Sequence, residues 1–131
     1  MKRPVELVEA VIQESGFPFD DIFLDEIPKE EVDFEEKTQI LLSESSNAPE
    51  EYGNSEFITM KYGVYIQIFY SNAEDSTIDT VSEELKLMQK LISEGWLIAQ
   101  SKEQYLDPTS RQMLRNLTVQ RTMTLSEIAN S

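Results

Sequence analysis

An acidic stretch at residues 20–36, DDIFLDEIPKEEVDFEE, concentrates carboxylate side chains that could bind a cation or act on DNA. Nine of its seventeen residues are Asp or Glu, and Lys29 is its one basic residue. Carboxylates bind Ca²⁺ or Mg²⁺ through oxygen, and arrays of them imitate DNA phosphates or repel DNA. Three interpretations are therefore open: cation binding, DNA mimicry, and a channel through which DNA passes without specific binding.

The spacing of these acidic residues does not favour a metal site. A twelve-residue calcium loop needs alternating ligands, a central glycine and a terminal glutamate, and residues 20–36 contain no glycine. Runs of charge are more often solvated surface. Pairs of carboxylates can hydrolyse glycosidic bonds, but nothing in the sequence selects two that face each other across a cleft. We predict no metal site and no cofactor.

Residue types that most enzymes use are missing from the chain. It contains no histidine and no cysteine, which removes the commonest general base, the commonest transition-metal ligand and any thiolate site. Its four glycines, at positions 16, 53, 63 and 95, are too dispersed for a phosphate-binding loop. We therefore expect no catalytic residues and a protein that is not an enzyme.

Charge is distributed unevenly along the chain, whose net charge is −14. Residues 1–56 contain 16 acidic and 4 basic residues, whereas residues 57–131 contain 9 acidic and 7 basic residues. A protein this acidic repels nucleic acid, while its nearly neutral second half could dock against the first half of another copy.

The length fits a single domain over residues 1–131. No apolar run has membrane-spanning length, so we expect no membrane contact.

Apolar periodicity predicts the elements that position these charges. Helical spacing over residues 4–15 and 77–94 predicts two amphipathic helices, the second with an apolar side of Ile78, Val81, Leu85, Met88, Leu91 and Ile92. Alternation over residues 57–70 predicts a long strand, with further strands at 22–24, 39–42, 96–99 and 113–125. We place acidic loops at about 28–38 and 43–56, and a frayed turn at 126–131. The predicted fold is α+β, a single mostly antiparallel sheet with two helices packed on it, in the order α-β-β-β-α-β-β.

Several motifs resemble a family of small tail components of siphophages and prophages of Gram-positive bacteria. They are Tyr52, Gly53 and Phe57 before the long strand, Gly63–Tyr70 within it, Gly95-Trp96 after the second helix, the turn Tyr105–Thr109, and the ending Thr122–Glu127. The resemblance covers most of the chain. It implies a tail terminator or head–tail joining component, which forms a ring, typically a hexamer, on the head-proximal end of the tail tube. Such a ring ends tube polymerisation and offers a surface to the filled head.

The resemblance also implies partners and a location. We expect further copies of the chain, as a ring or as a monomer in solution, together with the major tail-tube protein and a head-completion or connector protein. The protein would be made in the host bacterial cytoplasm and remain in the virion. Charge density and predicted loop position place an acidic DNA lumen at Glu30, Glu31, Asp33, Glu35 and Glu36, with Glu50 and Glu51 as second choice. We expect subunit contacts at Arg111, Arg115 and Arg121.

Two other functions stay open at the level of sequence. An acidic inhibitor that mimics DNA would bind a basic DNA-binding enzyme as a monomer or dimer and ignore tail-tube protein. A tail-assembly chaperone would be absent from finished particles. Capping of tail tubes by the purified protein separates the terminator from the inhibitor, and presence in finished particles separates it from the chaperone.

Overall fold

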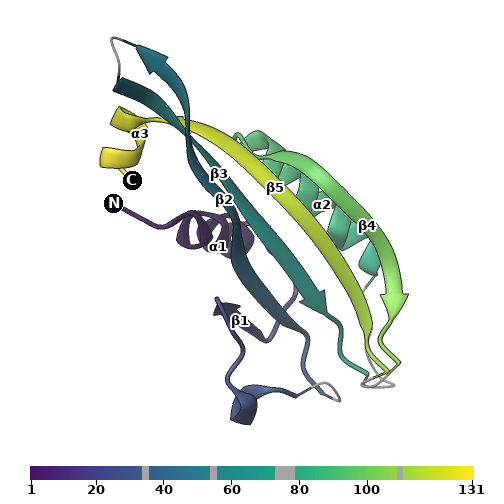
Figure 1. The fold of residues 1–131 in the computed structure, drawn as a ribbon. Helices are drawn as coiled ribbons and strands as arrows, with labels where there is room; N and C mark the ends of the chain where they lie inside the picture. Colours follow the sequence, from purple (N-terminus) through teal and green to yellow (C-terminus); the bar gives the residue numbers. More distant parts are fainter. Residues whose placement is uncertain (34–35, 54–55, 73–78, 109–110) are drawn as a thin grey trace.

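The computed structural model describes residues 1–33, 36–53, 56–72, 79–108 and 111–131 (Figure 1). Its elements are helix α1 (Pro4–Ser15), strand β1 (Asp21–Leu24), 3₁₀ helix η1 (Lys29–Glu31), strands β2 (Gln39–Gly53) and β3 (Glu56–Phe69), helix α2 (Thr80–Ser93), strands β4 (Leu97–Leu106) and β5 (Met113–Thr124), and helix α3 (Leu125–Ala129). One five-stranded sheet has the order β1-β2-β3-β5-β4. Only the β1–β2 pair is parallel among these neighbours. The predicted fold class is confirmed, with α3 in addition.

Helix α1 begins and ends where its sequence indicates. Pro4 occupies the first turn, where a missing N–H costs nothing, and the Arg3 N–H donates to Glu6 Oε1 at 3.0 Å. Gly16, with φ 78°, ends the helix in the left-handed conformation that glycine adopts without strain. The predicted apolar stripe faces the sheet and is buried: Val5, Val8, Val11 and Ile12.

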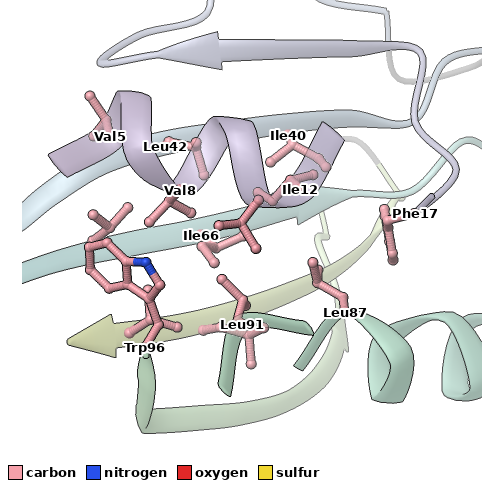
Figure 2. Close-up of a cluster of buried hydrophobic side chains, with 14 of the residues drawn as sticks. Val5, Val8, Ile12, Phe17, Ile40, Leu42, Ile66, Leu87, Leu91 and Trp96 are labelled. Atoms are coloured by element: carbon pink, nitrogen blue, oxygen red, sulfur yellow. The ribbon is translucent and has the colours of Figure 1, made fainter. Parts of the chain in front are cut away.

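The core lies between one face of the sheet and helices α1 and α2 (Figure 2). Val64, Ile66 and Ile68, at alternate positions of β3, are fully buried on that face, and each such side chain stabilises the fold by about 1.5–3 kcal/mol. Leu87 and Leu91 pack from α2. Trp96, the only tryptophan in the sequence, is 1% exposed where α2 leads into β4. No helix in the described part of the chain combines the length and apolar character needed to cross a bilayer.

Strand β2 corrects the acidic loop predicted at 43–56. Residues 43–53 continue the strand and pair with β3, and the resulting hairpin extends beyond α1 (Figure 1). A register shift between Glu44 and Ser46 marks a bulge, and Gly63 lies opposite, where an added methyl group would overlap the Ser45 hydroxyl. The segment is polar and contains Pro49, so pairing with β3 rather than strand propensity gives it this conformation.

The two remaining loop predictions had different outcomes. The described residues between 28 and 38 contain η1 and no strand. The frayed turn predicted at 126–131 is wrong, because helix α3 occupies Leu125–Ala129. Thr124 caps this helix: its Oγ1 accepts from the Glu127 N–H at 3.2 Å, and its own N–H donates to Glu127 Oε1 at 3.1 Å. Such a reciprocal pair satisfies two backbone donors at a helix start.

Helix α2 is turned differently from its predicted orientation. It begins at Thr80, and Asp79 caps it by accepting from the Ser82 N–H at 3.2 Å. The buried residues are Glu84, Leu87 and Leu91. Three members of the predicted apolar side are instead exposed to solvent, namely Val81 (66%), Leu85 (52%) and Ile92 (54%). Ile78 lies outside the described residues.

Candidate functional site

A buried polar network explains why α2 is turned this way. Glu84 is 5% exposed on the core side of the helix. Its Oε1 lies 3.1 Å from Nε of Arg115 on β5. The hydroxyl of Tyr70 and Nε2 of Gln104, the latter at 2.8 Å, both donate to Glu84 Oε2. One carboxylate therefore joins α2 to β4, β5 and the end of β3.

The electrostatics of this network make it structural. Burial, followed by the hydrogen bond to Glu84, raises the pKa of Tyr70 far above its usual range, so the phenol stays neutral. The Arg115 guanidinium also donates to the carbonyl of Lys102 and, at 2.7 Å, to Ser101 Oγ. The carboxylate accepts two hydrogen bonds and forms an ion pair with Arg115, and the phenol is a poor acid. The network can position α2, and its phenol is not an activated acid.

The three arginines predicted at subunit contacts are not brought together. Arg115 is engaged inside the fold, which leaves its side chain only 12% exposed. Arg121, six residues further along β5 and therefore about 20 Å away, pairs with Glu127 Oε2 at 3.1 Å. Arg111 is exposed in the turn before β5, with φ 64°, and its N–H donates to the Asp107 carbonyl at 2.8 Å. A contact role remains a prediction for Arg111 and Arg121, while the Arg115 guanidinium is occupied within the chain.

The first set of predicted lumen residues lies in and after η1. Glu30, Glu31 and Glu36 are exposed. Asp33 is half-buried, and its Oδ1 accepts from the Glu36 N–H at 3.1 Å. Glu35 lies outside the described residues. The segment is anchored by the buried side chain of Gln39, which accepts from the Asp33 N–H at 3.1 Å and donates to the Glu31 carbonyl at 2.6 Å.

Glu50 and Glu51, the second choice, lie in the outer half of the β2–β3 hairpin. Both are exposed, and Glu50 Oε2 accepts from Thr122 Oγ1 at 2.6 Å. Figure 1 shows the hairpin and η1 at opposite ends of the molecule. The predicted acidic residues therefore form two separate groups. Within the described residues, no three acidic side chains are grouped closely enough to hold a metal ion.

The sheet face opposite the helices carries a shallow groove of about 390 Å³. Its lining comes from four neighbouring strands: Ser43, Tyr65, Ile66, Gln67, Gln100, Lys102, Asn116, Leu117 and Thr118. Most of these side chains are uncharged hydrogen-bonding groups, and Tyr65 is 47% exposed. The groove could not be inferred from the sequence, although the polar residues at alternate positions of 57–70 indicated that this face is wet.

The sheet has two unlike open edges. Strand β4 is the last strand in the described sheet, so the outer side of Leu97–Leu106 has no strand partner there. At the other edge, β1 pairs only with residues 39–42 of β2. Residues 43–53 of β2 therefore have an unpaired outer side within the described sheet. Unpaired backbone groups at such edges can accept another strand.

The chain matches a known protein family. The family described as "Protein of unknown function (DUF806)" matches residues 2–124. Among curated proteins, none matches the chain. The family description states no activity, so it assigns no role to the edges, the groove or the acidic groups.

Proposed function

We propose that this chain, which belongs to the DUF806 family of proteins of unknown function, is a tail terminator or a closely related head–tail joining component of a siphophage or prophage. Copies of the chain form a ring at the head-proximal end of the tail tube. The ring ends tube polymerisation and lets DNA pass through an acidic lumen. The proposal starts from the motifs that resemble tail components of such phages.

The two unlike open edges of the sheet are the observation that carries this proposal. A head-to-tail ring requires two different surfaces on each copy that fit one another. The open stretch of β2 carries Glu44, Glu50 and Glu51, whereas β4 carries Lys102 and Glu103. Strand addition between these edges would supply main-chain hydrogen bonds. An acidic edge meeting a nearly neutral one also lowers the repulsion between copies of a chain with net charge −14.

The acidic group at η1 supports passage of DNA. Glu30, Glu31 and Glu36 are exposed, and they lie far from the hairpin that carries the open stretch of β2 (Figure 1). They therefore stay available while the edges are paired. Carboxylates along a lumen repel the phosphates of the duplex and prevent it from binding to the wall.

Mixing the purified protein with tail-tube subunits of the same phage or prophage tests the proposal. Electron microscopy is expected to show tubes that carry a ring at one end and stop growing, with the mass of the protein alone measured alongside. Tubes that remain uncapped, together with tight binding to a basic DNA-binding enzyme, would favour the acidic inhibitor. Capped tubes whose finished particles lack the protein would favour the assembly chaperone.

The lumen assignment has its own test. The triple variant Glu30→Lys, Glu31→Lys, Glu36→Lys is expected to fold and cap tubes but to impair DNA delivery from assembled particles. Glu14→Lys, which changes an exposed acid on α1 (67% exposed side chain), is the matched control. Normal infectivity of particles built with the triple variant would remove these residues from the lumen.

A further inference from the structure

An apolar stripe on α2 is left uncovered by the fold. It consists of Val81, Leu85, Met88 and Ile92, at intervals of four, three and four residues that align side chains along one flank of a helix. Val81, Leu85 and Ile92 are more than half exposed, while Met88 is partly buried. Contiguous apolar surface of this kind on a soluble protein marks an interaction site more often than isolated exposed residues do.

The α2 stripe points away from α1 and over the open edge of the sheet. Leu87 and Leu91 define the core side of α2, and Lys90, whose Nζ lies 4.0 Å from Glu14 Oε2, defines the side next to α1. At 3.6 residues per turn, the stripe and Lys90 lie roughly a quarter-turn to either side of the core direction. The Gln104–Glu84 hydrogen bond places β4 beneath α2. The stripe therefore continues the surface that begins at the outer side of β4.

Charge indicates what can approach this flank. The helix residues that border the stripe on its outer side, Ser82 and Gln89, are uncharged. A chain with net charge −14 repels its own copies at acidic surfaces, so self-association is favoured where acid is absent. On the sheet face opposite the helices, Lys102 of β4, next to Glu103, also complements Glu50 of the open stretch of β2.

We propose that the α2 stripe and the outer side of β4 together form the docking surface for a second copy of this chain. The second copy adds residues 43–53 of its β2 to β4, and its side chains on the helix-bearing face of the sheet cover the stripe. The inference rests on the proposed ring, since it assigns one of the two faces through which neighbouring subunits meet. Main-chain pairing gives the contact its register, and burial of the stripe gives it stability.

The double variant Leu85→Ser, Ile92→Ser tests the inference directly. Sedimentation velocity of the protein alone, and electron microscopy of tube-bound protein, are expected to show loss of the multimer. The melting temperature of the monomer should stay within about 3 °C, because both side chains are exposed. Leu125→Ser, which changes a leucine that is 44% exposed on α3, is the control and should assemble normally.

Thiol accessibility gives a second measurement, because the chain has no cysteine of its own. In Leu85→Cys the introduced thiol is expected to react with a maleimide in the monomer and to lose reactivity in the multimer. The thiol of Leu125→Cys should react equally in both. Equal reactivity at position 85 in monomer and multimer would overturn the inference.

The outcomes separate this inference from the proposed function. If the double variant assembles and caps tubes like the unchanged protein, the docking surface is wrong and the terminator proposal stands. If the unchanged protein forms multimers that depend on the stripe but do not bind tubes, the docking surface stands and the terminator proposal fails. A variant that still forms multimers but no longer binds tubes would mean that tube protein covers the stripe, which overturns the inference. If the unchanged protein stays monomeric both alone and on tubes, the docking surface and the terminator proposal are both wrong.

Discussion

Helices α1 and α2 cover the same face of the sheet, but only α1 buries the apolar stripe that its sequence displays. Val5, Val8 and Ile12 of α1 are fully buried. In α2 the corresponding stripe faces outward, and Glu84 points into the protein. The difference shows that the hydrophobic pattern of a helix does not by itself determine its orientation, because the opposing surface also contributes.

The opposing surface of α2 contains a charge. Arg115 of β5 alternates with Leu117 and Val119, which are buried on the helix-bearing side of the sheet. A buried guanidinium without a partner costs several kcal/mol, and Glu84 supplies that partner at 3.1 Å. Turning α2 to bury Leu85 would remove the carboxylate from Arg115. The ion pair therefore selects the orientation that exposes the stripe.

Replacing Arg115 should cause the largest loss in the free energy of unfolding. Arg115→Leu leaves the Glu84 carboxylate buried without its cation, and we expect it to lower the free energy of unfolding by about 3–5 kcal/mol, as measured by urea denaturation. The double variant Glu84→Leu, Arg115→Leu should recover part of the loss, because it removes both buried charges but leaves the Tyr70 hydroxyl without its acceptor. Arg121→Leu, which removes a more exposed pair, is the control. An Arg115→Leu protein as stable as the unchanged one would contradict the selection of α2 orientation by this pair.

Adjacent residues of α2 give the next test. Leu91 is 0% exposed and Ile92 is 54% exposed. Leu91→Ala should cost about 2–5 kcal/mol through lost burial and a cavity, whereas Ile92→Ala should change the unfolding free energy of the monomer by about 0.5 kcal/mol or less. Urea denaturation of the two variants at low protein concentration measures the difference. Similar losses for both would mean that the helix adopts the other orientation in solution.

The ionisation of Tyr70 should have a smaller effect, on how the stability of the protein changes at alkaline pH. Because folding raises the pKa of this phenol, the unfolded chain loses the proton first, from about pH 10 upward. The stability that depends on the protonated phenol is therefore complete below that pH and declines as pH rises. Tyr70→Phe should cost about 1–2 kcal/mol at pH 7 and flatten the alkaline decline. Parallel declines in both proteins between about pH 10 and 12 would refute this account.

The smallest effect is expected for the ion pair at the start of α1. Arg3 donates two hydrogen bonds of 2.8 Å to the Asp25 carboxylate, and these lower the pKa of Asp25. The contribution of this exposed pair is present above the ordinary aspartate pKa of about 4 and disappears as pH falls through the lower folded value. In Arg3→Ala, NMR titration should return the pKa of Asp25 towards its ordinary value. An unchanged titration would show that the pair does not persist in solution.

Patterns confined to one face of an element could be predicted from the sequence. The stripe of α1 and the alternating residues of 57–70 each face a single apolar environment, so their periodicity indicated the structure. The strand conformation of residues 43–53 could not be predicted in this way, because a polar strand that extends past α1 has no apolar face that would show in the sequence. Helix α3 carried a usable signal, since Thr124 and Glu127 have the spacing of a capping box, although the prediction for this segment was a turn.

The orientation of α2 and the separation of the acidic residues into two groups could not be predicted from the sequence, for a different reason. Glu84 and Arg115 are far apart in the sequence, and the chain offers 25 acidic residues as possible partners. Periodicity does not identify which carboxylate is buried. Similarly, the acids at η1 and in the hairpin look equivalent by composition, and only the fold places them at opposite ends of the molecule (Figure 1).

The burial of Trp96 at the junction of α2 and β4 has a spectroscopic consequence. As the only tryptophan in the chain, it is the sole source of indole fluorescence, and at 1% exposure its ring is shielded from water in the isolated subunit. Its emission should shift to longer wavelength when the core opens but stay nearly constant when subunits associate. The protein therefore contains an intrinsic optical reporter that distinguishes unfolding from dissociation without any label.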